Sequence, residues 1–275
     1  MTTSAPTRRQ APLVPPQHGA WAFLGLPVAV AVTVSPWSAL LLLLAVTWVA
    51  AYPASYFLLA LVRDRSSRHP DPARFRRPLT VWWAIALASG FTLLVFRPWL
   101  VSVGLIYAAS FLVNLAFARR RDERALLNDL VFIVQCTAMV VVTWAVAAGQ
   151  RSILPPPLAD VPTHVWVLTV AVGLVLIGST LHVKSLIRER AHPAFARNSR
   201  VFAALSLAGS LALAHWWGLP AGAPLAVPYG WLAARSFAMR SPAPRPGIIG
   251  MIELAGFVLL VAAAAVAQAW SQTGE

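Results

Sequence analysis

Several ionisable and polar side chains occur inside long apolar segments of this sequence, where a charged group is costly unless it has a partner or a function. Glu253 lies about two helical turns inside one such segment, and His182 and Lys184 lie near the end of another. Basic side chains such as His182 and Lys184 can bind an anionic group directly. The predicted ligand-binding residues are His18, Tyr56, Asp64, Arg77, Asn114, Asn128, His182, Lys184, Arg188, Glu189 and Glu253.

These polar residues share a predicted depth in the membrane. If the apolar segments cross a bilayer in alternating directions, most of the candidates fall in the same leaflet, whereas the other leaflet holds almost nothing ionisable except His215. A concentration of polar groups from several helices predicts a cavity that opens towards the cytoplasm. No residue is assigned a catalytic role, and no metal site or cofactor is predicted.

Each candidate also has a structural explanation, and both remain open. Asn128 can cap the helix that follows it, and His182 and Lys184 can extend to the membrane interface. Tyr56 fits an interfacial aromatic belt, and His18 fits an interfacial anchor. The arginines fit plain topology signals or contacts with anionic lipid.

Composition predicts the elements that must position these residues. Hydrophobic residues make up 59% of the chain and charged residues 11%, whereas a soluble domain carries roughly 25% charged residues. The apolar runs are uninterrupted and have the length of a membrane-spanning helix, which excludes a β-barrel. We therefore predict an all-α, polytopic transmembrane helical bundle of about nine spans. The predicted spans are residues 19–34, 37–62, 79–96, 98–118, 127–148, 164–187, 201–217, 220–237 and 247–270.

We expect two parts in the chain: a disordered cytoplasmic arm, residues 1–17, and a single transmembrane helical domain, residues 18–271. All but two of the 22 basic residues, Arg97 and Arg151, fall on one side of the membrane if the N-terminus is cytoplasmic. This bias predicts a multi-pass protein of the inner (cytoplasmic) membrane with its N-terminus inside. Because the bases lie in short loops, they indicate topology and not nucleic-acid binding, and membrane lipids are the expected partners.

Two segments resemble a known family. The run from Pro16 to Phe23, which reads PQHGAWAF, is similar to the opening signature of the YwiC-like family of bacterial integral membrane proteins. The stretch from His182 to Arg190 is similar to a second segment of that family. The resemblance extends over about residues 12–270 and implies a membrane protein, but it implies no particular activity.

A more distant resemblance concerns the UbiA superfamily of intramembrane prenyltransferases, which also has nine spans, an internal N-terminus and large inner loops after spans 2 and 6. In that superfamily the first of these loops carries an Asn-Asp-x-x-Asp-x-x-x-Asp motif and then Arg-Pro-Leu. Here Arg77-Pro78-Leu79 matches the Arg-Pro-Leu, and Asp64 falls on the middle aspartate. Ala60, Leu61 and Arg68 occupy the other three motif positions.

The second aspartate motif of that superfamily should lie around residues 182–190, where Glu189 is the one acid. The resemblance therefore implies a UbiA-like fold in which bases replace most of the carboxylates that would hold Mg²⁺ on a diphosphate. We expect a protein that binds an amphiphilic or anionic lipid-like ligand, such as an isoprenoid or quinone-like amphiphile, without Mg²⁺-dependent catalysis. The alternative is a UbiA-like prenyl or lipid transferase that acts on a diphosphate, and the sequence leaves open whether the protein is an enzyme.

Overall fold

The computed structural model describes residues 11–65, 70–120, 122, 125–153, 157–239 and 244–273. These residues form α-helices and short helical turns, and no strand occurs among them. The helices are α1 (His18–Thr33), α2 (Leu40–Arg65), α3 (Arg76–Phe96), α4 (Leu100–Arg120), α5 (Leu126–Ala147), α6 (Thr163–Val183), α7 (Pro193–Trp217), α8 (Ala226–Ala238) and α9 (Pro246–Thr273). The turns are η1 (Pro72–Phe75), η2 (Lys184–Arg188) and η3 (Ala223–Leu225), and η2 is a π-helical turn.

The prediction of an all-α polytopic helical bundle is confirmed. Within the described ranges, six helices are long and apolar enough to cross a membrane: Leu40–Arg65, Pro72–Phe96, Leu100–Arg120, Leu126–Ala147, Thr163–Arg188 and Pro246–Thr273. All of α4 is described, and Ala118 is its one buried residue, so Leu105, Ile106 and Leu112 are exposed. Exposed apolar surface of this extent requires lipid around it. The chain is a membrane protein.

Three of the nine predicted spans fall short of these criteria. Helix α1 has 16 residues and α8 has 13, so at about 1.5 Å per residue both are shorter than the hydrocarbon core of a bilayer. Helix α7 is long enough, but it begins at Pro193 and includes Arg197 and Arg200, which we expected in a loop. That α1, α7 and α8 cross the membrane stays a prediction.

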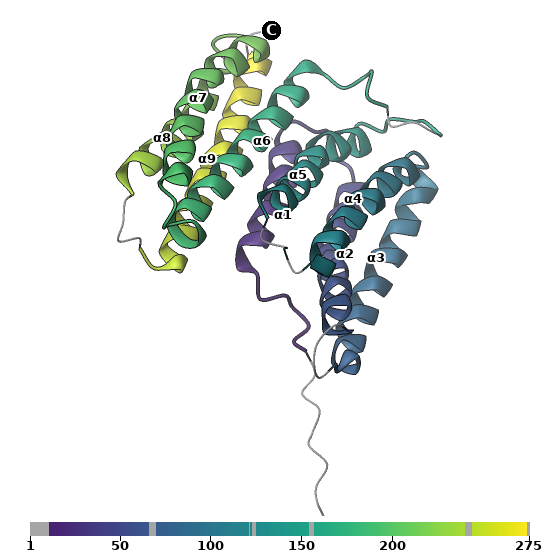
Figure 1. Cartoon of the computed structure of the whole chain (residues 1–275). Helices are drawn as coiled ribbons and strands as arrows, with labels where there is room; N and C mark the ends of the chain where they lie inside the picture. Colours follow the sequence, from purple (N-terminus) through teal and green to yellow (C-terminus); the bar gives the residue numbers. More distant parts are fainter. Residues whose placement is uncertain are drawn as a thin grey trace, which may run out of the picture. The chain divides into compact units, whose positions relative to one another are not determined.

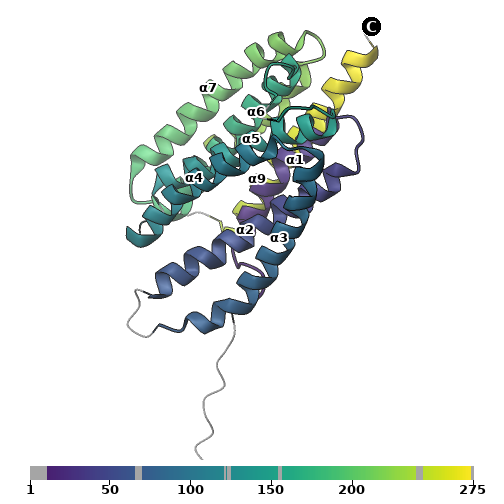
Figure 2. The same cartoon turned by 90° about the vertical axis from the view of Figure 1, so that its right-hand side faces the viewer.

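The chain divides into two compact units, and each is described by itself. Unit 1 comprises residues 1–18, 39–128 and 151–156, and it contains α2, α3 and α4. Helices α2 and α3 run side by side as a hairpin (Figures 1 and 2). At their loop end, Phe57, Ala60 and Phe75 form a buried apolar cluster.

The N-terminal segment of unit 1 lies along this hairpin. The Ala11 amide donates a hydrogen bond to the Arg74 carbonyl at 3.2 Å, and Trp82 Nε1 donates to the Leu13 carbonyl at 2.7 Å. Further along, the Tyr52 hydroxyl donates to Gln17 Oε1 at 2.8 Å. Residues 1–10 of the predicted arm lie outside the described residues. The disordered arm and the single domain stay predictions.

Unit 2 comprises residues 19–38, 129–150 and 157–275, and it contains most of α1 and α5 and all of α6 to α9. Phe23 of α1 stacks on Phe132 of α5 and meets Phe257 of α9 edge to face, which joins three helices. Helices α6, α7, α8 and α9 are neighbours in sequence and in space (Figure 1). Their connections place the C-terminal ends of α6 and α8 beside the N-terminal ends of α7 and α9.

Candidate functional site

A buried group of charged and polar side chains lies at this shared end of unit 2. We call it the buried cluster and define it as Ser179, His182, Arg235 and Glu253. Arg235 Nη1 donates a hydrogen bond to Glu253 Oε1, and the two side chains are 4% and 7% exposed. The Ser179 hydroxyl also hydrogen-bonds the Glu253 carboxylate. The cluster is therefore built around one carboxylate.

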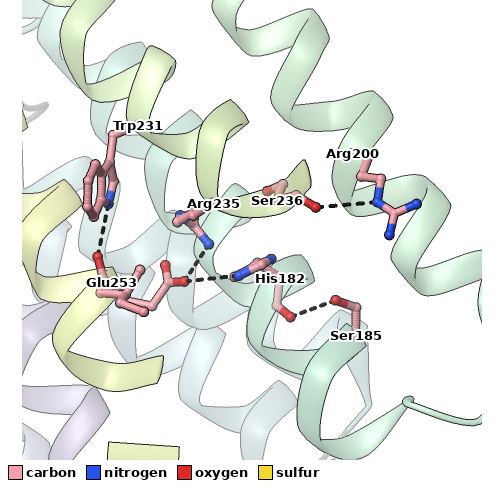
Figure 3. Close-up of polar contacts among 8 residues, drawn as sticks. His182, Ser185, Arg200, Trp231, Arg235, Ser236 and Glu253 are labelled. Atoms are coloured by element: carbon pink, nitrogen blue, oxygen red, sulfur yellow. Dashed lines mark hydrogen bonds and ion pairs between the residues drawn. The ribbon is translucent and has the colours of Figure 1, made fainter. Parts of the chain in front are cut away.

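His182 belongs to the cluster but makes no hydrogen bond through Nε2. This atom lies 4.0 Å from Glu253 Oε1, which is beyond hydrogen-bond distance (Figure 3). It is buried and has no hydrogen-bond partner among the described residues. An imidazole nitrogen in this position retains the capacity to accept or donate one hydrogen bond.

Three helices position the cluster. Ser179 and His182 are three residues apart on α6 and so share one face of that helix. Gly178 permits α8 to approach this face, because a β-carbon there would lie 2.3 Å from Leu232 Cδ2. Two further hydrogen bonds hold the helices together: the Tyr229 hydroxyl donates to the Ala171 carbonyl at 3.0 Å, and Trp231 Nε1 donates to the Ile252 carbonyl at 3.0 Å.

Lys184, on η2, forms a second ion pair, in which the lysine is buried and the aspartate is partly exposed. Its Nζ lies 2.8 Å from Asp129 Oδ2 in the first turn of α5, and its side chain is 5% exposed. In the π-helical turn the Glu189 amide donates to the Lys184 carbonyl, five residues back, at 2.8 Å. Lys184 is therefore held inside the unit by a carboxylate and does not extend to the interface.

Most of the other described bases at this end of unit 2 are exposed. Arg188 ends η2 and Arg190 follows it, and both side chains are exposed. Glu189 is half-buried, and its carboxylate lies 3.9 Å from His192 Nε2, so this pair is largely surrounded by solvent. Arg200 is turned inward, and its Nε donates to the Ser236 carbonyl at 3.3 Å (Figure 3).

The candidates in unit 1 have structural partners. Asp64 is 6% exposed and accepts hydrogen bonds from the Asp71 amide at 2.7 Å and from Arg74 Nη2 at 2.8 Å. Its carboxylate thus joins the end of α2 to η1. Tyr56 packs against the Phe57 cluster, and Arg77 is exposed in the first turn of α3. Arg68, the last position of the motif, lies outside the described residues.

Three further candidates do not help to define a site. Asn114 is half-buried on α4, and its Oδ1 has no hydrogen-bond partner among the described residues. Asn128 lies inside the first turn of α5, which begins at Leu126, so it does not occupy the capping position. His18 begins α1, and its side chain lies outside what the structure describes.

The structure brings His182 and Glu253 together, and Glu253 faces the interior of unit 2. Sequence reasoning did not include Ser179, Asp129 or Arg235 among the site residues. One feature of the sequence could have indicated the charged partners, because a buried acid and a buried base each require a counter-ion. In the described ranges no group of three or more His, Cys, Asp and Glu side chains is arranged to hold a metal ion.

Comparisons with known proteins relate the chain to one family. The sequence model of the family described as YwiC-like protein matches residues 14–144, which include the PQHGAWAF run. A relative from Bacillus subtilis (strain 168), called uncharacterized protein YwiC, is 29% identical over 189 residues, which cover 67% of this chain and 71% of the relative. No solved structure matches the chain. The resemblance to the UbiA superfamily stays a prediction. Over residues 14–144 the chain is similar to the YwiC-like family.

Proposed function

We propose that this YwiC-like protein binds an amphiphile with an anionic head group at the charged end of unit 2. The observation that carries the proposal is the buried cluster, where Arg235, Glu253 and His182 meet inside an apolar helical unit. Ionisable side chains in such a place are expensive and usually mark a ligand or ion site. The unpartnered Nε2 of His182 supports a binding role, because a buried polar atom without a hydrogen bond is unusual in a native structure.

The surroundings of the cluster suit an amphiphile. Arg188 and Arg190 are exposed at the end of η2, about two helical turns beyond His182. Exposed guanidinium groups attract phosphate, sulfonate or carboxylate head groups. Apolar side chains such as Met251 and Leu254 are exposed on the first turns of α9 and offer contacts to a hydrocarbon tail. An isoprenoid or quinone-like amphiphile has this combination of parts.

The proposed orientation places this end of unit 2 at the cytoplasmic face of the inner membrane. Lys184, Arg188, Arg197, Arg235 and Arg245 all lie at the C-terminal ends of α6 and α8 or at the N-terminal ends of α7 and α9. The positive-inside rule assigns the end with most bases to the cytoplasm.

The proposed binding does not use Mg²⁺. Asp64 falls on the middle aspartate position of the UbiA motif, and its carboxylate is already bonded to the Asp71 amide and to Arg74. A transferase that required Asp64 as a metal ligand would first have to break these bonds.

Native mass spectrometry of the full-length protein, purified in mild detergent, tests the proposal. We expect a retained anionic amphiphile as an additional mass, and its occupancy should fall in Arg188→Gln and stay unchanged in the control Arg97→Gln. Spectra that contain only the protein mass, together with no uptake of added anionic amphiphile, would refute the proposed function.

A further inference from the structure

The buried charges of unit 2 compensate each other. Arg235 is paired with Glu253, and Lys184 is paired with Asp129. With neutral His182, the two pairs together have no net charge. A negative head group that enters at this level therefore finds no uncompensated buried base among the described residues of the unit.

Taking Arg235 or Lys184 away from its carboxylate would not solve this problem. Moving Arg235 would leave buried Glu253 without its counter-ion, and an uncompensated buried charge is strongly unfavourable. Moving Lys184 would leave the partly exposed Asp129 unpaired. A positive charge must therefore come from a group that can acquire one.

His182 is such a group. Imidazole is the side chain that gains or loses its charge near neutral pH, and Nε2 of His182 has no hydrogen bond to give up. Without an anion beside it, a proton on His182 would place a second positive charge beside Arg235 and next to a single carboxylate. With an anion present, the same proton would complete a second pair.

We infer that binding of an anionic head group at the buried cluster is coupled to the uptake of one proton by His182. The proton comes from solvent, an N–H bond forms at Nε2, and no other covalent bond changes. This inference rests on the proposed function, since it states how the same site accepts its ligand. It also specifies the ligand, because a neutral head group requires no proton.

The charged groups around His182 are consistent with this coupling. Helix α9 presents Glu253 and α8 presents Arg235. On the neighbouring η2, Lys184 faces Asp129 of α5. From α7, Arg200 bonds the Ser236 carbonyl, and the buried Ser199 and Ser206 are uncharged. Exposed Arg188 keeps its charge at every pH of interest.

The test measures affinity for a long-chain alkyl sulfonate, whose charge does not change with pH, in phosphatidylcholine nanodiscs that contain the full-length protein. The alkanol of the same chain length is the uncharged control ligand. Between about pH 8 and about pH 5, we expect the affinity for the sulfonate to rise by up to about tenfold for each pH unit. Affinity for the alkanol should not change.

Variants assign the proton to a residue. His182→Gln should bind the sulfonate with an affinity that no longer depends on pH. His164→Gln, in the first turn of the same helix, is the matched control and should keep the wild-type dependence. If His182→Gln does not fold, a pH-indicator dye in weakly buffered solution measures the wild-type protein directly, and about one proton should be taken up for each sulfonate bound.

The outcomes separate the two proposals. Sulfonate binding that is retained but independent of pH, or without proton uptake, would overturn the inference and leave the proposed function standing. A pH dependence that persists in His182→Gln would overturn the role of His182. Absence of sulfonate binding at every pH would overturn the proposed function and the inference with it.

Discussion

The Arg235–Glu253 pair yields a quantitative prediction about stability. Its side chains are 4% and 7% exposed, so solvent does not screen the interaction. Replacing Glu253 with Gln keeps an oxygen that can accept hydrogen bonds from Ser179 and Arg235, but it removes the negative charge. The uncompensated guanidinium should then lower the free energy of unfolding by about 3–5 kcal/mol.

The matched control is Glu189→Gln. Glu189 also faces a basic partner, His192, but these side chains are 32% and 70% exposed. Solvent screens such a pair, and its removal should cost about 0–1 kcal/mol. Unfolding in mixed micelles with increasing sodium dodecyl sulfate, followed by circular dichroism, compares the two variants with the wild type.

A double variant separates charge from packing. Arg235→Met together with Glu253→Gln removes both charges and should recover most of the stability lost in Glu253→Gln alone. The reasoning fails if Glu253→Gln lowers the free energy of unfolding no more than Glu189→Gln does. It also fails if the double variant loses more free energy of unfolding than its two single variants lose together.

Four further predictions follow from the sequence and the geometry. Reporter fusions after Gly149 and after Arg240 should report opposite sides of the membrane, and reporters on the same side would contradict the proposed topology. Binding of the alkyl sulfonate should survive EDTA and weaken in high salt, as isothermal titration can show, because exposed ion pairing is screened. A thermal melt should find Gly222→Ala less stable than Gly178→Ala, since a β-carbon at Gly222 meets the Ala214 backbone at 2.5 Å whereas one at Gly178 meets the movable end of Leu232. Asp64→Asn should accelerate proteolysis of the connection between α2 and η1, measured by limited digestion, and should leave sulfonate affinity within about twofold, while a complete loss of binding would restore Asp64 as a ligand residue.

The sequence predicts most helices of this protein because most apolar runs end close to arginines or prolines. The sequence predicts the first residues of α7 and α8 less well. Residues 188–200 are charged and suggested a loop, yet a helix begins at Pro193, since proline suits the first turn and a helix can extend beyond the membrane. Helix α8 begins at Ala226, because Pro220, Gly222 and Pro224 form turns against the end of α7.

Part of the candidate site could be predicted from the sequence on physical grounds. An acid in an apolar run must face the interior, and Glu253 does. Its partner Arg235 was not predicted, because a sequence does not reveal which helices are neighbours. Lys184 points inward to Asp129 through a π-helical turn, and hydrophobic periodicity does not anticipate a change in helical register.

Photo-crosslinking tests the central claim most directly, because it locates the head group. A long-chain alkyl sulfonate with a diazirine beside the head is incorporated with the full-length protein into nanodiscs, irradiated, and mapped by peptide mass spectrometry. The account predicts labels within residues 179–190 and 246–257, displaced by excess unlabelled sulfonate. Labels spread over the exposed surface of α4, without displacement, would contradict it.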